Sequence, residues 1–366
     1  MGARTEMLEH TFSCKTPASE CRLLVGNGIT GRMISAIKEN NTGLVVAGSG
    51  FLNSWNMVFE NIEKSLPEIQ VARVEDGEGL KTFDSYIDLI KVMRSCRLDR
   101  GSSIAYFGGG TLGDLTGFCA STYMRGIGLL AFPTTLLAMI DSSLGGKNGI
   151  DLADGKNAVG TFYNPSMVMM DTAFLQKGAE HQKQGIAEMA KYGFIRDVSI
   201  IDDLLSFSDY TALTRYHALP DLIFKCARIK MDIVSADPQE KSGERELLNF
   251  GHTVGHAIER ASGYTIPHGT AVMWGMRIES QLTFSMFGIK DVASDRIDDI
   301  AKRFNIDQIS IGKDMHQKLM DAIKYDKKVR SGNITVQALD GPGSCRNLVL
   351  PVDKYLEALG KWLKEN

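Results

Sequence analysis

The sequence lacks the features that mark membrane, disulfide-rich and nucleic-acid-binding proteins. No run of about 18 apolar residues occurs in its 366 residues, and Met1–Lys15 has no apolar signal core. The six cysteines are scattered without a CxxC pair, which favours reduced thiols. Basic and acidic residues nearly balance, 41 against 44, so any cationic site must be local. We therefore expect a soluble cytoplasmic protein with no membrane or nucleic-acid partner.

Internal repeats are absent as well, and the order of the predicted elements indicates the fold class. Short β-rich runs at 42–50 and 102–110 end in glycines, and a third buried strand at 129–140 continues into a helix. Strands that alternate with helices predict a doubly wound, Rossmann-like parallel sheet. After about Thr172 helical periodicity prevails. We predict an α/β domain over 1–172 and a mainly helical domain over 173–366.

The glycine-rich run FGGGTLGDLTGF, residues 107–118, follows a predicted strand and opens a predicted helix. Its glycines would let the backbone approach a pyrophosphate, towards which the helix N–H groups point. A simple turn is the alternative. The run is not GxGxxG, so an ordinary Rossmann dehydrogenase is a poor match.

A second glycine-rich stretch, residues 141–165, places Lys147 and Lys156 beside glycines and Asn157. Lysines in a glycine-rich loop can bind phosphate. Solvated lysines in ordinary turns are the alternative, and this stretch alone does not decide between the two.

Three of the seven histidines lie within residues 252–268. His252 and His256 are four residues apart and so share one helical face, although the spacing lacks the glutamate of HExxH. His268 lies in a predicted loop. Glu188, on another predicted helix, could join two imidazoles in a catalytic zinc pattern. The alternative is a surface ion pair of Glu188 with Lys191 and unrelated histidines.

Eight segments, in this order, resemble the 3-dehydroquinate synthase family of sugar-phosphate cyclases. They are DRGSSIAYFGGGTLGDLTGF, TYMRG, FPTTLLAMIDSSLGGKNG, GKNAVGTFYNP, GIAEMAKYG, GERELLNFGHTVGHAIE, IPHG and YDKK. The resemblance implies an NAD-binding domain followed by a helical metal domain, in a homodimer. It also implies a lyase that converts 3-deoxy-D-arabino-heptulosonate 7-phosphate, a keto sugar acid phosphate, to 3-dehydroquinate and phosphate in the shikimate pathway. The implied sequence is transient oxidation, phosphate elimination, re-reduction and intramolecular aldol closure.

The resemblance also implies the site residues. One divalent metal, zinc or cobalt, would be held by Glu188, His252 and His268. The substrate site would contain Asp141, Lys147, Asn157, Lys191, Lys230, Arg245, Asn249, His256 and Lys327, with Arg125 reaching across the dimer. NAD would be held by Glu78, Lys81, Gly109, Gly110, Asp114, Thr134, Thr135, Ser142, Lys156 and Thr172.

The chain departs from the family pattern in a few places. Ala47 and Gly48 stand where the family usually has an aspartate that contacts the adenosine ribose, so weaker discrimination between NAD and NADP is expected. Other departures are Asn148, Asp151, Gln239 and Lys241. Three further functions remain as alternatives. They are another sugar-phosphate cyclase such as 2-deoxy-scyllo-inosose synthase, a metal-dependent polyol dehydrogenase, and a non-catalytic protein that binds metal and NAD.

Overall fold

The computed structural model describes residues 7–13, 20–152, 155–326 and 328–365, without the side chains of 155 and 156. The contacts divide the chain into two compact units. The first unit is Met1–Gln182 with Thr214–Gln239, and the second is Lys183–Leu213 with Glu240–Asn366. The domain boundary expected at residues 172 and 173 stays a prediction. No described helix is both long and apolar enough to cross a lipid bilayer.

The first unit is built on a seven-stranded sheet with the order β1-β2-β9-β6-β5-β3-β4. The strands are β1 (Leu8–Ser13), β2 (Glu20–Gly26), β3 (Thr42–Gly48), β4 (Gln70–Val74), β5 (Ser103–Gly108), β6 (Gly128–Pro133) and β9 (Met167–Asp171). The edge strand β1 is antiparallel to β2, and the other neighbours pair in parallel. The predicted parallel sheet is therefore confirmed.

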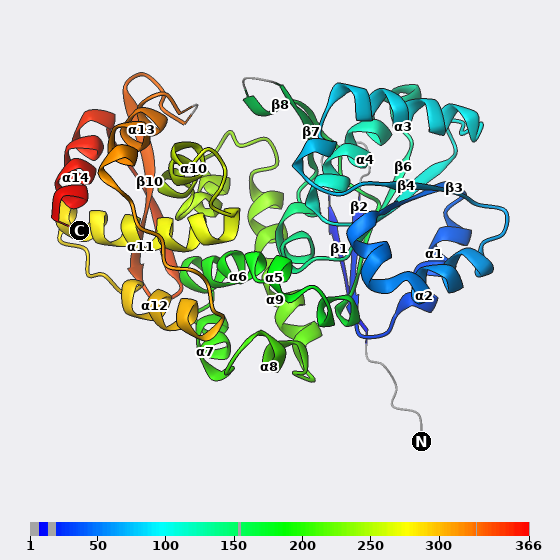
Figure 1. Ribbon diagram of the computed structural model, residues 1–366, viewed down its shortest axis with the longest axis horizontal. Coiled ribbons are helices and arrows are strands. Elements are labelled where there is room, and N and C mark those ends of the chain that lie inside the picture. Colours follow the sequence, from blue (N-terminus) through cyan, green and yellow to red (C-terminus); the bar gives the residue numbers. More distant parts are fainter. Residues whose placement is uncertain (1–6, 14–19, 153–154, 327, 366) are drawn as a thin grey trace. The chain divides into compact units, whose positions relative to one another are not determined.

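Helices cover both faces of this sheet, which is why its inner strands are apolar along their whole length. Helices α1 (Thr30–Glu39) and α2 (Ser49–Ser65) lie on one side, and α3 (Phe83–Ser95) and α4 (Gly110–Thr122) on the other (Figure 1). All residues of β5 are buried. Helix α2 follows β3 and α4 follows β5, so both N-termini lie at the carboxyl edge of the sheet.

The second glycine-rich stretch forms a hairpin of β7 (Lys147–Leu152) and β8 (Gly155–Phe162), not the predicted loop. Its glycines serve the strand pairing. A Cβ added to Gly149 would lie 2.6 Å from the Val159 carbonyl oxygen, and one added to Gly160 would lie 2.3 Å from that of Asn148. The backbones therefore approach more closely than side chains would allow.

The remaining elements of the first unit are short, apart from α9 (Leu219–Ala236), which packs on β1 and β2. They are η1 (Glu78–Leu80), η2 (Tyr123–Arg125), η3 (Ala138–Ser142), η4 (Thr172–Gln176) and α5 (Ala179–Gln182); α8 (Tyr210–Thr214) ends at the boundary of the two units. Because α9 lies far along the chain from β1 and β2, its position beside them is determined by tertiary packing and not by local sequence.

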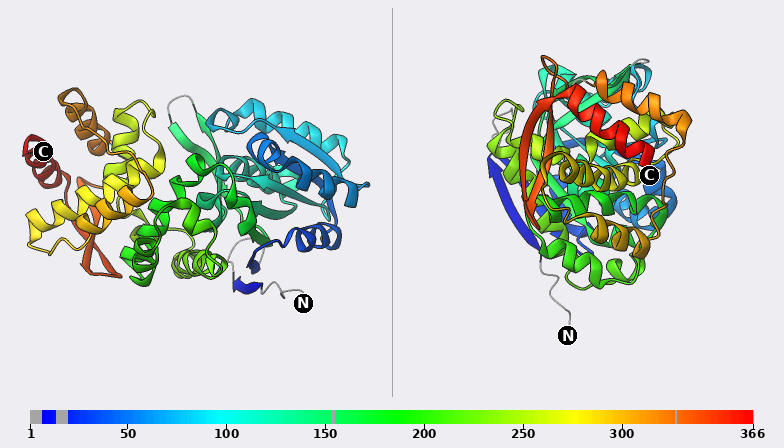
Figure 2. Two further views of the ribbon diagram at one scale, coloured as in Figure 1. Left: turned by 60° about the horizontal axis from the view of Figure 1, so that its bottom comes forward. Right: turned by 90° about the vertical axis from the view of Figure 1, so that its left-hand side faces the viewer.

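The second unit is mainly helical, as predicted. Its elements are α6 (Gln184–Ile195), α7 (Ser199–Ser206), η5 (Glu244–Asn249), α10 (His252–Ala261), α11 (His268–Phe287), α12 (Ser294–Arg303), α13 (Lys313–Lys324), β10 (Asn333–Gly341), β11 (Ser344–Pro351) and α14 (Val352–Glu365). The sequence did not predict the antiparallel β10–β11 ribbon, orange-red in Figure 2. Apolar side chains of α10, α11, α13, α14 and the ribbon form one buried core.

A buried carboxylate inside this unit fixes the start of α10. Glu279 of α11 is 1% exposed, and its two oxygens accept the N–H groups of Gly251 at 2.8 Å and Val254 at 2.9 Å. These are among the N–H groups that a helix leaves unpaired at its N-terminus. Glu279 therefore ties the first turn of α10 to α11.

This carboxylate makes stability depend on pH. Burial raises the pKa of Glu279 from 4.5 to about 7, although the N–H groups of Val254 and Gly251 and the charge of Lys328 oppose the shift. The folded state holds the extra proton, so the contribution to stability is present at low pH and is lost as pH rises through about 7.

We predict that Glu279→Gln flattens this dependence. Between about pH 5 and about pH 8 the unfolding free energy of the wild type should fall by on the order of 3 kcal/mol more than that of the variant. Urea unfolding at a series of pH values measures the difference. Parallel pH profiles for the two proteins would contradict the assignment.

Candidate metal centre and cofactor loop

Helices α10 and α11 approach each other at glycines. A Cβ on Gly275 would lie 2.0 Å from the carbonyl oxygen of Gly251, and one on Gly255 would lie 3.1 Å from that of Ala271. Only glycine permits this backbone contact. The contact brings the N-terminal residues of both helices, His252 and His268, to the same place.

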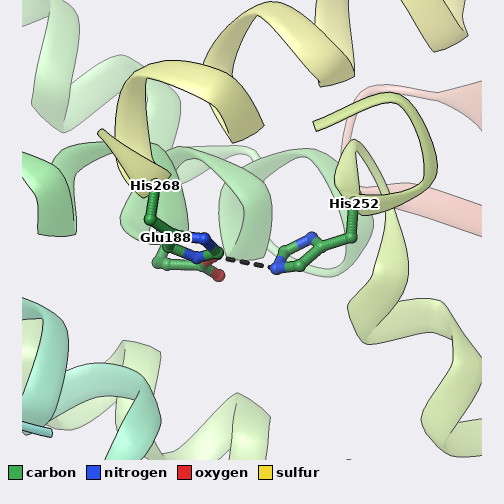
Figure 3. Close-up of side chains that lie close together, drawn as sticks. All are labelled: Glu188, His252 and His268. Atoms are coloured by element: carbon green, nitrogen blue, oxygen red, sulfur yellow. Dashed lines mark ion pairs between the residues drawn. The ribbon is translucent and has the colours of Figure 1, made fainter. Parts of the chain in front are cut away.

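Three side chains from three helices converge there (Figure 3). The Oε1 atom of Glu188, on α6, lies 3.1 Å from Nε2 of His252 and 3.4 Å from Nε2 of His268. Within the described part of the chain, one ligand atom from each of the three lies within 4.8 Å of the others. His268 is the first residue of α11 and does not lie in a loop as predicted; Pro267, with an extended backbone, is the N-cap of this helix.

The Glu188 carboxylate is buried and ionised. It is 0% exposed, so the alternative prediction of a surface ion pair is wrong. Glu188 and Lys191 do form an ion pair, but this pair is buried. Burial alone would raise the pKa of Glu188, but the charges of Lys191 and His252 hold it well below its usual range. Neither oxygen has a hydrogen bond of ordinary geometry within the described residues. A buried anion with two imidazole nitrogens beside it fits a divalent cation.

Each of the two histidine rings is oriented by a hydrogen-bond acceptor at Nδ1, the ring nitrogen away from Glu188. Nδ1 of His252 lies 3.2 Å from the Phe250 carbonyl oxygen, and Nδ1 of His268 lies 3.3 Å from Oε2 of Glu259. An acceptor at Nδ1 keeps an N–H there and turns Nε2, the atom that would bind a metal, towards Glu188.

The pKa values of the two rings shift in opposite directions. Burial lowers the pKa of His252, although the charge of Glu188 opposes this shift. Burial also opposes a charge on His268, but the neighbouring carboxylates of Glu188 and Glu259 raise its pKa to about 10. A metal ion would therefore displace a proton from His268.

The sequence pattern did not point to Glu259. Its only signal was position: Glu259 lies three residues after His256 and seven after His252, so all three share one face of α10. His256, Glu259 and His268 also form a second group whose ligand atoms lie within 4.8 Å of one another in the described structure.

The other residues predicted in the second unit lie as follows. The His256 ring centroid is 5.2 Å from that of His252, so His256 adjoins the three-residue group. Arg245 is 4% exposed, with Nε 3.4 Å from Oε1 of Glu240. Asn249 is half-buried at the end of η5, and Lys327 lies outside the described residues.

In the first unit, the glycine-rich run forms the N-terminus of α4. Gly109 caps the helix and Gly110 is its first residue. A Cβ on Gly110 would lie 2.5 Å from Oγ of Ser142, and this buried hydroxyl has no hydrogen-bond partner among the described residues. Unpaired helix N–H groups beside a buried, unsatisfied hydroxyl fit the pyrophosphate of a dinucleotide.

A polar network lies close to this loop. Lys81 is 4% exposed, and its Nζ lies 2.8 Å from Asp114 and 3.8 Å from Asp151. It also donates to Asn157. Burial raises the pKa of Asp114 to about 6, and Lys81 acts in the opposite direction. The fold therefore brings together the predicted Lys81, Asp114 and Asn157, and it adds Asp151.

The remaining predicted residues of the first unit are spread over several elements. The Lys230 ammonium lies 2.9 Å from the Asp141 carboxylate and donates to the Asp141 carbonyl at 2.6 Å. The Thr134 N–H donates to the carbonyl of Gly108, Thr135 lies against Gly109, and the buried Thr172 hydroxyl accepts from Asn27. Glu78, Arg125 and Lys147 are exposed, and the Lys156 side chain lies outside the described structure.

The fold is shared with two solved structures. A 2-deoxy-scyllo-inosose synthase complexed with carbaglucose-6-phosphate, NAD+ and Co2+ aligns with a TM-score of 0.81 and 23% identity, over 97% of this chain and 99% of that one. A 2-epi-5-epi-valiolone synthase from Streptomyces hygroscopicus, with NAD+ and Zn2+ bound, aligns with a TM-score of 0.82 and 21% identity, over 94% and 96%. At these identities the likeness shows the fold alone, which is the dehydroquinate synthase-like fold.

The sequence comparisons define the family within this fold. Models of the 3-dehydroquinate synthase N-terminal and C-terminal regions match residues 71–184 and 185–329. A 3-dehydroquinate synthase from Saccharolobus solfataricus is 36% identical over 340 residues, 92% of this chain and 94% of the relative. The chain belongs to the 3-dehydroquinate synthase family and is an enzyme of this type, a lyase. The resemblance seen in the eight segments is confirmed.

The three-residue group gives a prediction about metal content. Glu188→Ala, His252→Ala and His268→Ala should each lose bound zinc or cobalt, because two remaining donors are too few. His256→Ala should keep the metal. Elemental analysis of the purified variants measures the metal content. Equal content in His252→Ala and wild type would contradict the ligand assignment.

The orientation of His268 gives a second prediction. Glu259→Gln should weaken zinc affinity about 10- to 100-fold, because an amide can donate to Nδ1 and so reverse the ring's tautomer. Competition with a chromophoric chelator measures the affinity. Arg260→Gln, an exposed change on the same helix, serves as control and should leave the affinity unchanged. Wild-type affinity in Glu259→Gln would assign the orientation of His268 to packing alone.

Proposed function

We propose that this protein is a 3-dehydroquinate synthase. It converts 3-deoxy-D-arabino-heptulosonate 7-phosphate to 3-dehydroquinate and phosphate, as a step of the shikimate pathway to aromatic amino acids. The observation that carries the proposal is the convergence of Glu188, His252 and His268 in a chain of this family. NAD and one divalent metal, zinc or cobalt, are the proposed cofactors.

The chemistry of the residues indicates which of the two cofactors each set would hold. Glu188, His252 and His268 would hold the metal, which supplies a Lewis acid for hydroxyl groups of the substrate. The glycine-rich N-terminus of α4, with Ser142, Lys81 and Asp114, would hold NAD, which supplies a reversible hydride acceptor. Two neighbours in fold support this pairing, since both were solved with NAD+ and with Co2+ or Zn2+.

The protein's own groups provide charge and proton handling. Lys191 neutralises part of the Glu188 charge from the same helix. His256 adjoins the metal group, so it is placed to meet a substrate anion or to carry a proton. Asp141 holds the Lys230 ammonium in a fixed position. These groups therefore orient the substrate and move its protons.

The substrate carries a phosphate dianion and a carboxylate, which require cations in a chain of net charge −3. Arg245 is buried, and its planar guanidinium suits bidentate binding of a carboxylate. Lys147, Lys191, Lys230 and Lys327 are the proposed point charges of the site. Glucose 6-phosphate has no carboxylate, so it would leave Arg245 without its substrate anion.

We also infer a homodimer and a cytoplasmic location. Arg125, which the family resemblance assigns to the partner's substrate site, lies exposed in η2 with a left-handed backbone, φ 71°.

The decisive experiment is turnover of the keto sugar acid phosphate with NAD and zinc. Phosphate and the carbocyclic product should form in equal amounts, and NAD should be recovered oxidised because the net reaction is redox-neutral. Net NADH formation from a simple polyol would identify a dehydrogenase. Comparable rates with glucose 6-phosphate would identify another cyclase, and absence of phosphate release would identify a binding protein.

Arg245→Leu provides the matched test of substrate identity. The variant should lose most turnover, because loss of one partner of a buried polar pair between site and substrate lowers turnover by about 10⁴-fold. Metal content and NAD affinity should stay at wild-type values. Near-wild-type turnover by this variant would contradict the carboxylate assignment.

A further inference from the structure

The strand next to the glycine-rich loop ends without a polar side chain. β3 pairs in parallel with β5, with Ala47 opposite Phe107, so β3 ends beside the start of α4. In dinucleotide-binding sheets an acidic side chain at such a strand end accepts the ribose hydroxyl groups of the adenosine. Here the last residues of β3 are the buried Ala47 and Gly48.

Another carboxylate occupies the space that this side chain would fill. Asp76 follows β4, the parallel neighbour of β3 on the side away from β5. A Cβ built on Gly48 would lie 2.3 Å from Oδ1 and 2.6 Å from Oδ2 of Asp76. The backbone of Gly48, at φ −79° and ψ 145°, would accept any residue. The absence of a side chain at Gly48 therefore makes room for Asp76.

Asp76 is held firmly in this position. Its Oδ2 accepts the Gly50 N–H at 2.6 Å, and its own N–H donates to Oγ of Ser49 at 3.0 Å. Within the described part of the chain, Oδ1 accepts no hydrogen bond, and the residue as a whole is exposed. One oxygen thus anchors the carboxylate at the start of α2, and the other lies in the space that a side chain at Gly48 would fill.

We propose that Asp76 binds the 2′- and 3′-hydroxyl groups of the adenosine ribose and determines the preference for NAD over NADP. The proposal rests on the proposed function, which requires NAD. A carboxylate accepts hydrogen bonds from a diol and repels the 2′-phosphate of NADP. The acid that β3 lacks is supplied from β4, so the preference for NAD is retained in spite of Ala47 and Gly48.

A purely structural role for Asp76 would be to cap α2. The two roles predict different measurements, because capping affects stability whereas ribose binding affects the ratio of the NAD and NADP dissociation constants. Glu75 is the matched control, since it is an exposed acid one residue earlier.

The first experiment compares Asp76→Asn and Glu75→Gln with the wild type by titration calorimetry with NAD and with NADP. Asp76→Asn should lower the preference for NAD about 10- to 100-fold, the range expected for charge-assisted hydrogen bonds. Glu75→Gln should keep the wild-type ratio. If Asp76→Asn keeps the wild-type ratio of the NAD and NADP dissociation constants, the proposal is overturned. This holds even if the thermal midpoint of the variant falls, because Asp76 would then only cap α2.

The second experiment moves the carboxylate back to β3. Gly48→Asp alone should lower the thermal midpoint and NAD affinity, because its Cβ would overlap Asp76. Asp76→Ala alone should lose the NAD preference, and the double variant Gly48→Asp/Asp76→Ala should regain most of it. A double variant no more selective than Asp76→Ala would overturn the proposal. A wild type that binds neither nucleotide would overturn the proposed function itself.

Discussion

The buried negative charge of Glu188 is the constraint on which the second unit depends. A lone ionised carboxylate at 0% exposure would cost several kcal/mol, and neighbouring charges must offset this cost. Lys191 does so from the next turn of α6, and His252 and His268 do so from α10 and α11. The glycine contact between α10 and α11 and the Glu279 anchor hold these imidazoles in place.

The first unit repeats one arrangement at two strand ends. A glycine leaves a space at the carboxyl edge of the sheet, and a side chain from a distant segment fills it. Ser142 lies against Gly110 after β5, and Asp76 lies against Gly48 after β3. In both places a polar atom reaches the edge where parallel sheets bind ligands. The glycines therefore matter through the side chains that they admit.

Local patterns were enough to predict the parallel sheet and the helix that carries His252 and His256. The runs at 42–50 and 102–110 became β3 and β5, because buried parallel strands are apolar along their length and end at glycines. Residue types and spacing made the metal group and the loop at α4 candidates, the family motifs favoured them over their alternatives, and the fold brings their members together. Glu259 was not predicted, because acidic residues at helical spacing are common on solvated helix faces.

The sequence by itself determined the family, the alternation of strands and helices in the parallel sheet, and the residue types available for a metal and a dinucleotide. Only the tertiary structure decided which distant groups meet. It placed α9 with the first strands, paired β7 with β8, and set Glu259 behind His268 and Asp76 in the space at Gly48. The reason is physical: periodicity records which face of an element is buried, whereas contacts between distant segments depend on how closely two backbones can approach.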